Sequence, residues 1–325
     1  MRDSDVPRGQ RQAQGQRQGS PKLLITGGTG LLGATVVKEA VGRAWDVVAT
    51  RHASAAPALT GVRWFELDLA TPGAAAQVIE RARPSVIVHT AVAIAPEQLD
   101  PVIVRGSEEV ARAARNAGAA LVHVSSDMVF DGESGPFDED APLSPITDYG
   151  RAKAEAEVRV RAAHDGASVA RLSLLYRLDP PDRSLAAWLE GARGAADGAG
   201  GAGGAGGAGG AGGAYPLFTD EVRCPGEVGD VARALLDLAF RLAAGPPGLP
   251  EVRTVHLVGP TAITRYDFGR LVLEALGLPD SLARPALSAS SGLVRPRALH
   301  LLRRTTPPSL VAGIRGPEEA LAVRP

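Results

Sequence analysis

The stretch KLLITGGTGLLGATVVKEAVGRA, residues 22–44, joins an apolar run that ends in glycines to a run with apolar residues at helical spacing. This order predicts a strand, a tight turn and a helix. Gly27, Gly30 and Gly33 form the pattern G-x-x-G-x-x-G at the turn. The first glycine allows a sharp turn, the second lets the backbone approach a pyrophosphate, and the third lets helix and strand pack closely. Because a helix start offers free N–H groups to an anion, the stretch favours a dinucleotide-binding turn over a purely structural one.

The alternation of strands and helices continues along the next hundred residues. The apolar runs 46–50, 62–67, 85–92 and 120–126 are predicted strands, rich in Val, Ile and Leu and without polar alternation. Strands of this kind are buried on both faces, as in a parallel sheet covered by helices. Residues 71–84 predict a helix with Thr71 at its cap and Pro72 in its first turn, and residues 96–118 a helical stretch interrupted near Pro101. The predicted fold class is α/β, a doubly wound parallel sheet of the Rossmann type over residues 21–175.

The second half of the chain has a different pattern. Residues 193–214 are almost purely Gly and Ala and predict a flexible loop, since such a tract loses much backbone entropy on ordering and buries little. Residues 228–243 resume a helical pattern, residues 252–259 a strand, and Thr264 and Asp267 have capping-box spacing at the start of another helix. These pieces predict a smaller α+β C-terminal substrate domain over 176–325, with a helix at 226–245 that returns to the Rossmann domain. Residues 1–20 predict a disordered tail.

Composition excludes several classes of function. With 35 basic and 36 acidic residues the net charge is −1, so no nucleic-acid partner or acidic membrane surface is expected. The first twenty residues lack the apolar region of a signal peptide and no run approaches the length of a membrane span, so we expect a soluble cytoplasmic protein. The single cysteine, Cys224, is expected to be chemically idle, and the six histidines contain no ligand-like pair at i, i+4, so we expect no metal site.

The end of the second predicted strand indicates which dinucleotide binds. An acidic residue there would hydrogen-bond the ribose of NAD, whereas NADP needs a positive charge for its 2′-phosphate. The strand ends in Arg51 and His52, which favours NADPH, with NADH as the alternative if Arg51 is an ordinary surface arginine. Asp68, after the third strand, is a candidate adenine contact.

DYGRAKAEAE, residues 148–157, places Tyr149 and Lys153 four positions apart at the start of a predicted helix. Residues i and i+4 share one helix face, so a phenol and an ammonium lie side by side, and the positive charge is expected to lower the pKa of Tyr149 toward a range useful for acid catalysis. Alone, the spacing is common by chance and favours an ordinary helix surface. The serines of SSD, residues 125–127, lie upstream on the same chain as the glycine turn, and a serine there would hydrogen-bond the carbonyl oxygen that Tyr149 protonates.

TGGTGLLG, SSD and YGRAK together resemble the extended short-chain dehydrogenase/reductases. Residues 122–157 look more narrowly like the dTDP-4-dehydrorhamnose reductase branch, which has S-T-D-x-V-F-D-G, an acidic and proline-containing loop and Y-G-x-x-K in this order. Residues 83–92 are similar to the fourth strand of that branch, residues 218–239 to its later D-E-x-x-x-P segment and helix, and residues 294–301 to its Arg-Pro motif. The resemblance covers about residues 22–300, strongly up to 175.

The resemblance implies the roles of individual residues. Ser126 would polarise the carbonyl, with Ser125 as the alternative if the register differs by one. Tyr149 would donate the proton, and Lys153 would hold the nicotinamide ribose and lower the tyrosine pKa. The cofactor-binding residues that it implies are Gly27, Thr29, Gly30, Leu31, Leu32, Gly33, Arg51, Asp68, Leu69, Thr90, Ala91 and Lys153.

The leading hypothesis is therefore an NADPH-dependent reductase of a nucleotide-linked 4-keto-deoxysugar in dTDP-rhamnose biosynthesis. An epimerase or a dehydratase is the nearest rival, but Met128 follows Asp127 where related dehydratases have glutamate, and Arg51 replaces the acid of an NAD-retaining epimerase. A third hypothesis is a non-catalytic dinucleotide-binding regulatory subunit, as some relatives of this branch are. The resemblance also leaves a homodimer open.

Overall fold

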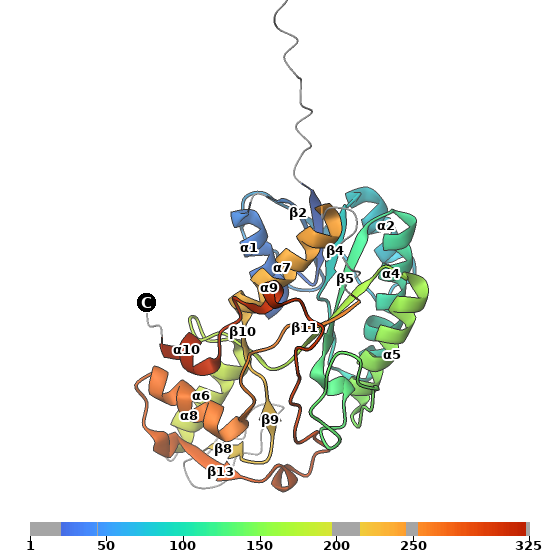
Figure 1. Ribbon diagram of the computed structural model, residues 1–325. Coiled ribbons are helices and arrows are strands. Elements are labelled where there is room, and N and C mark those ends of the chain that lie inside the picture. The colour runs from blue at the N-terminus through green and yellow to red at the C-terminus, as the bar shows by residue number, and fades with distance from the viewer. Residues whose placement is uncertain (1–20, 44, 197–214, 245–252, 323–325) are drawn as a thin grey trace, which may run out of the picture.

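A seven-stranded parallel sheet forms the centre of the computed structural model, which describes residues 21–43, 45–196, 215–244 and 253–322 (Figure 1). The strand order is β11-β6-β5-β4-β1-β2-β3, so the order reverses between β1 and β4. The predicted α/β fold class with a doubly wound sheet is confirmed. In such sheets ligands bind outside the carboxyl ends of the strands, where the order reverses. The strands are β1 (Lys22–Thr26), β2 (Asp46–Arg51), β3 (Val62–Glu66), β4 (Val86–His89), β5 (Ala120–Ser126), β6 (Ser168–Leu172) and β11 (Thr254–His256).

Helices cover both faces of this sheet, which explains why its strands are apolar on both sides. One face packs against α1 (Leu31–Gly42) and α7 (Val228–Ala244), whose Val36, Val37 and Leu235 are fully buried with the strands. The other face packs against α2 (Ala74–Ala82), α4 (Gly106–Asn116) and α5 (Asp148–Ala163). Figure 1 shows the two layers on opposite sides of the strands.

One predicted helix differs from the sequence expectation and a second stretch agrees with it. The helix expected over 71–84 begins only at Ala74, and neither Thr71 nor Pro72 caps it; Glu109 of α4 accepts hydrogen bonds from the N–H groups of Gly73, Ala75 and Ala76 at 3.0–3.2 Å instead. The stretch from Pro96 to Asn116 is interrupted as expected. It comprises α3 (Pro96–Gln98), a π-helix (Leu99–Arg105) containing Pro101, and α4. Proline lacks the N–H that a regular helix requires.

A smaller lobe is built mainly from the second half of the chain. Its core lies between α6 (Arg183–Ala196), α8 (Arg265–Ala275), α10 (Pro317–Ala322) and a pair of parallel strands, β8 (Tyr215–Phe218) and β13 (Ala283–Ala286). Thr264 caps α8 by accepting from the Asp267 N–H at 3.0 Å, as the capping-box spacing predicts. The remaining short elements are β7 (Leu175–Tyr176), β9 (Val222–Arg223), β10 (Gly226–Glu227), β12 (Ile263–Thr264), α9 (Pro308–Val311) and the 3-10 helices η2 (Asp127–Val129), η3 (Asp280–Leu282) and η4 (Ser288–Ser291).

Two boundaries in the second half are corrected by the structure. The strand predicted over 252–259 was expected in the smaller domain, but β11 pairs with β6 and forms the edge of the large sheet. The first residues of the Gly/Ala tract, 193–196, end α6, and its remainder and the tail at 1–20 lie outside the described residues. Residues 226–245 contain α7, which packs on α1 of the large sheet. The division of the chain into two domains stays a prediction.

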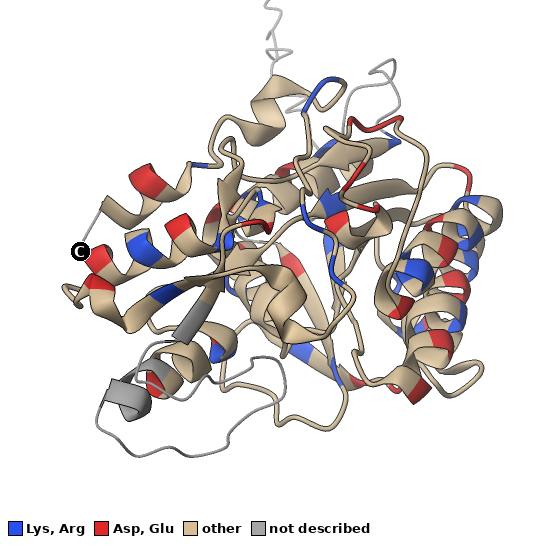
Figure 2. Cartoon of the chain, turned by 90° about the horizontal axis from the view of Figure 1, so that it is seen from below, with Lys and Arg blue, Asp and Glu red and all other residues tan. Residues whose placement is uncertain are grey.

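Charges of both signs are interspersed over the surface, as Figure 2 shows on the helices α4 and α5. Arg159 of α5 pairs with Glu108 of α4 and with Glu155 of its own helix, so the signs largely compensate locally. Within the described ranges no helix is long and apolar enough to cross a membrane.

Candidate active site

The glycine turn lies at the carboxyl end of β1, where the strand order reverses. Gly27 has φ +68°, a conformation that other residues rarely adopt. A Cβ at position 27 would lie 2.7 Å from the Cα of Ala91, and a Cβ on Gly33 would overlap the carbonyl oxygen of Gly27. The first helix therefore approaches the turn more closely than any side chain would allow. Gly30, the N-cap of α1, gives it no side-chain cap hydrogen bond.

The end of β4 lies against the same turn. The Thr90 hydroxyl donates to the Thr26 carbonyl at 2.6 Å, and the Ala91 N–H donates to the Thr26 hydroxyl at 3.4 Å. The structure thus brings Thr90 and Ala91 together with Gly27, and the three residues could contribute to a single cofactor-binding site. Leu31 and Leu32 begin α1 beside it, Thr29 lies in the turn before the N-cap Gly30, and all three are half-buried.

Arg51 and Asp68 lie at the ends of neighbouring strands, but both already have partners. The Arg51 guanidinium pairs with the Glu66 carboxylate at 3.1 Å, because the two residues are in register on β2 and β3. Asp68 accepts from the Ala70 N–H at 2.9 Å and from the Thr71 hydroxyl at 3.1 Å, which holds the turn after β3. Leu69 is buried in the core beneath that turn. Arg51 can therefore meet a phosphate only by sharing or leaving Glu66.

Ser126, Tyr149 and Lys153 come together at the end of β5. The first turn of α5 packs very closely on η2, since a Cβ on Gly150 would overlap the carbonyl oxygen of Met128. This close approach places the neighbouring Tyr149 beside Ser126. Lys153, one helical turn further, is buried and donates from Nζ to the Val124 carbonyl at 2.7 Å. Ser125 is also buried, and its hydroxyl has no hydrogen-bond partner among the described residues.

The pKa of Tyr149 moves in the opposite direction to the sequence expectation. Burial and then the Asp127 carboxylate raise the pKa of Tyr149 to about 12, although the Ser126 hydrogen bond lowers it. Burial lowers the pKa of Lys153 to about 8, and the nearby Glu157 acts against this change. The expectation considered the charge of Lys153 alone and neglected the cost of burying a phenolate. At neutral pH the phenol is therefore neutral.

Asp127 and Arg223 contact the site, although sequence reasoning gave neither a role there. Asp127 lies next to Ser126 and is buried beside Arg223, with the carboxylate oxygen 3.8 Å from the Arg223 Nε. Arg223 also pairs with Glu221 at 3.0 Å. The position of Asp127 directly after Ser126 in the sequence could have predicted that it lies at the site. Glu221 and Arg223 belong to the D-E-x-x-x-P segment that the resemblance includes.

The surroundings of Cys224 suit packing. The Cys224 thiol is buried, and burial raises its pKa to about 11, which makes it a poor nucleophile at neutral pH. In the described part of the chain no group of three or more His, Cys, Asp or Glu side chains could hold a metal ion.

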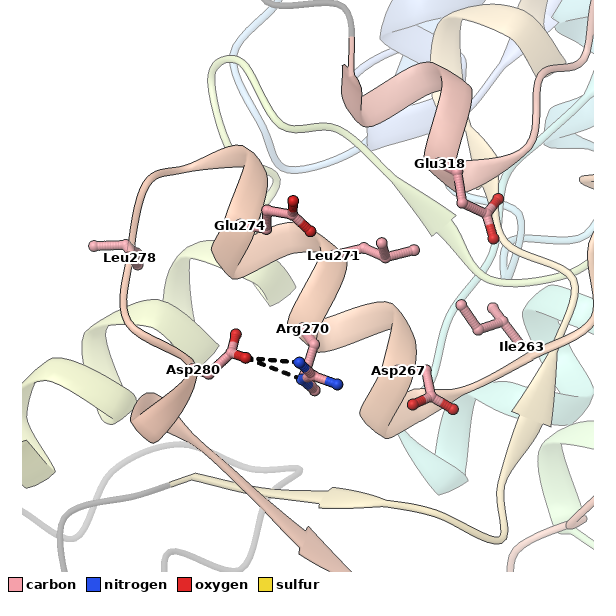
Figure 3. A pocket seen from close by; sticks show the side chains of 8 residues that line it. All are labelled: Ile263, Asp267, Arg270, Leu271, Glu274, Leu278, Asp280 and Glu318. Carbon is pink, nitrogen blue, oxygen red and sulfur yellow. Dashed lines mark hydrogen bonds and ion pairs between the residues drawn. The ribbon is translucent and has the colours of Figure 1, made fainter.

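A pocket of about 680 Å³ lies in the smaller lobe, away from these residues (Figure 3). It is lined from α8, η3 and α10, and Arg270 there pairs with Asp280 at 2.7 Å. The other charged lining residues are the carboxylates Asp267, Glu274 and Glu318. Because none of Ser126, Tyr149 and Lys153 lines it, this pocket is separate from the candidate active site.

The model of the RmlD substrate binding domain family matches residues 21–184, just over half of the 325-residue chain. The chain belongs to this family. The RmlD family match agrees with the resemblance found in the sequence to the sugar-nucleotide reductase branch of the extended short-chain dehydrogenase/reductases, which is thereby confirmed.

Three known proteins illustrate the range of similar chains. Methionine adenosyltransferase 2 subunit beta of Xenopus laevis is 31% identical over 82% of this chain and 75% of the relative. The probable low-salt glycan biosynthesis reductase Agl14 of Haloferax volcanii is 29% identical over 85% of this chain and 86% of that protein. The crystal structure of dTDP-4-dehydrorhamnose reductase from Bacillus anthracis in complex with NADP superposes with a TM-score of 0.71 at 20% identity, covering 93% of this chain and 98% of that one. The last comparison shows the shared fold.

Proposed function

We propose that this chain is an NADPH-dependent reductase of a nucleotide-linked 4-keto-deoxysugar, as in dTDP-rhamnose biosynthesis. The observation that carries the proposal is the cluster of a neutral phenol on Tyr149, close to Ser126, with the buried ammonium of Lys153 one helical turn away. Binding a dinucleotide alone requires none of these three side chains to be placed together. The resemblance to sugar-nucleotide reductases supports the substrate class.

The residues at the carboxyl ends of β1, β2 and β4 fit a dinucleotide. A Cβ on Gly27 or Gly33 would fill the space at the turn, so a pyrophosphate can approach the backbone there. The first N–H groups of α1 point toward the same place and favour an anion. Arg51 supports NADPH over NADH, because a 2′-phosphate carries more charge than the Glu66 carboxylate with which it would compete.

The chain's own residues then perform the proton chemistry. A bound dihydronicotinamide supplies a hydride to the carbonyl carbon of the sugar. Ser126 and Tyr149 would hold the carbonyl oxygen by hydrogen bonds, and Tyr149 would transfer its phenolic proton to that oxygen as its negative charge develops. The product is an alcohol, and the proton lost from Tyr149 is replaced from solvent. Lys153, still mainly charged at pH 7, would stabilise the transient phenolate and hold the nicotinamide ribose.

The proposal is tested by mixing purified protein, dTDP-4-dehydrorhamnose and either NADPH or NADH, and following absorbance at 340 nm. We expect oxidation of NADPH, and a loss of roughly 100-fold or more in Tyr149→Phe, because general acid catalysis contributes about 10²–10⁴-fold. Tyr266→Phe on α8 is the matched control and should retain the parent rate. Equal rates in parent and Tyr149→Phe would refute the assigned acid.

A second candidate, a non-catalytic dinucleotide-binding subunit, is favoured by one finding. The 31% identical relative carries the name of a subunit of methionine adenosyltransferase. Calorimetric binding of both the cofactor and the nucleotide sugar, without oxidation of either cofactor, would favour this candidate over the reductase. Binding of the cofactor without the sugar would retain the dinucleotide site and refute the proposed substrate.

A further inference from the structure

The carboxyl end of β2 is bonded directly to the glycine turn. The Gly28 N–H donates to the Thr50 carbonyl at 2.8 Å, and the Gly27 N–H donates to the Thr50 hydroxyl at 3.2 Å. Arg51 follows Thr50 as the last residue of β2, and its side chain is 33% exposed. In Rossmann-type folds the adenosine ribose lies at this strand end when the pyrophosphate lies on the turn. The Arg51 guanidinium is therefore placed where a group on the 2′ position of that ribose would lie.

The pairing of β3 with β2 brings a carboxylate to the same place. Glu66 ends β3 and is the register partner of Arg51, and beyond this pair the Leu67 N–H donates to the Arg51 carbonyl at 2.9 Å. Register partners on adjacent strands point to the same face of a sheet. The Glu66 Oε2 accordingly lies 3.1 Å from the Arg51 Nη2, on a side chain that is 72% exposed. The ion pair is thus a consequence of the sheet register and not of a bound ligand.

The same two strands carry a second cross-strand ion pair at their other end. The Arg63 Nη2 lies 3.6 Å from the Oδ1 of Asp46, the first residue of β2. Both pairs are accessible to water, and such pairs contribute little to stability. Of the two, Arg51–Glu66 lies at the carboxyl edge of the sheet, where ligands bind. A weak stabilising role fits both pairs equally, whereas a role toward a ligand fits Arg51–Glu66.

We propose that Glu66 is a specificity-determining residue that reduces the preference of this site for NADPH over NADH. The inference rests on the dinucleotide site of the proposed function and assigns a new residue to it. To meet a 2′-phosphate, the Arg51 guanidinium has to leave the Glu66 carboxylate or share its donors with it, because both anions bind through the same N–H groups. NADH has a hydroxyl in place of this phosphate and leaves the ion pair intact. The carboxylate therefore weakens the binding of NADPH and not that of NADH.

The test is a calorimetric titration of the protein with NADPH and with NADH, without any sugar. We expect Glu66→Gln to bind NADPH roughly threefold to tenfold more tightly than the parent, and to bind NADH within about twofold of it. Glutamine keeps the size of the side chain and removes its charge. Asp46→Asn makes the same change of charge at the other end of the two strands, and both of its affinities should stay within about twofold of the parent values.

The Arg51→Ala background separates competition for the guanidinium from simple repulsion of the phosphate. Without Arg51 the Glu66 carboxylate has no guanidinium to occupy, so adding Glu66→Gln should change the NADPH affinity by less than about twofold. Repulsion between the carboxylate and the 2′-phosphate would instead tighten NADPH binding equally in both backgrounds. We expect competition to dominate, because water and salt screen charges as exposed as that of Glu66.

An NADPH affinity in folded Glu66→Gln that equals or falls below the parent value overturns the proposal. Equal gains for the two cofactors, or an equal gain in the Arg51→Ala background, overturn it as well. Glu66→Ala also removes the carboxylate and decides the question if Glu66→Gln does not fold. If the titrations behave as expected but the parent protein reduces no nucleotide sugar, the proposed reductase function fails and the role of Glu66 stands. The two failures are therefore distinguishable.

Discussion

Lys153 should make the protein less stable than a chain with an apolar residue in its place. It is 4% exposed, and burial lowers its pKa from 10.5 to about 8. Each pKa unit corresponds to about 1.4 kcal/mol, so holding the ammonium in the folded protein at pH 7 costs about 3 kcal/mol. The Lys153→Met variant removes this cost but also the hydrogen bond to the Val124 carbonyl, worth about 1 kcal/mol. We expect a net stabilisation of about 2 kcal/mol together with loss of the proposed reductase activity.

The sign of the pH dependence follows from the lowered pKa. As pH rises through about 8 the folded lysine loses its proton, whereas the unfolded lysine keeps it up to about 10.5. Between these two pKa values the unfolded state binds more protons, so the parent protein becomes more stable as the pH rises. The free-energy cost of burying Lys153 decreases accordingly. At pH 9.5 the remaining cost is about 1 kcal/mol, and the advantage of Lys153→Met should be close to zero.

Urea unfolding of both proteins at pH 7 and pH 9.5 measures these differences. Lys38→Met on the exposed side of α1 is the matched control and should change the free energy of unfolding by less than about 0.5 kcal/mol at both pH values. A Lys153→Met protein no more stable than the parent at pH 7 would refute the reasoning. An advantage of the same size at both pH values would do so as well.

Two further predictions concern the cofactor end and the helix start of the site. Arg51→Ala should weaken NADPH binding about tenfold to a hundredfold, because a charge-assisted hydrogen bond to the 2′-phosphate is worth about 1.5–3 kcal/mol, and should change NADH binding less than about twofold. Calorimetric titration of both cofactors measures these affinities, with Arg63→Ala as the control. Equal losses of affinity for both cofactors would contradict the prediction. Gly150→Ala should destabilise the protein by about 1–3 kcal/mol, because its Cβ would overlap the Met128 carbonyl, and should lower kcat at least about tenfold through displacement of Tyr149. Gly42→Ala, which meets no atom within 4 Å, is its control, and an unchanged kcat in Gly150→Ala would show that Tyr149 does not depend on this contact.

The sequence predicted the sheet well because its signals are local. Apolar runs between helical repeats identified all of β1 to β5, and the three glycines located the turn between β1 and α1. β11 was assigned to the wrong domain because it pairs with β6, more than eighty positions away in the sequence. The residues of β11 do not indicate which strand they pair with. The cap of α2 was missed for the same reason, since Glu109 reaches it from another helix.

The candidate site was predicted as a set of residues but not in its electrostatics. The order of Ser126, Tyr149 and Lys153 along the chain is enough to propose that they meet. The pKa of Tyr149 depends on how deeply the phenol is buried and on Asp127, and neither can be read from the i, i+4 spacing with Lys153. Likewise, the pattern placed Arg51 at the ribose end but did not reveal that Glu66 already holds it.

The cost of Lys153 belongs to a wider arrangement of buried polar side chains. His89, at the end of β4, and His123, its neighbour in the middle of β5, are both fully buried next to it, and burial followed by the charge of Lys153 lowers the pKa of each. The ring nitrogens of His123 have no hydrogen-bond partner among the described residues, which a core selected for stability alone would avoid. Away from the strand ends, β4 and β5 bury apolar residues such as Ile87 and Leu121. On β4 and β5, the buried polar side chains therefore lie on the carboxyl side of the apolar ones, toward the proposed reacting groups, and this order along the two strands fits a catalytic use of Lys153.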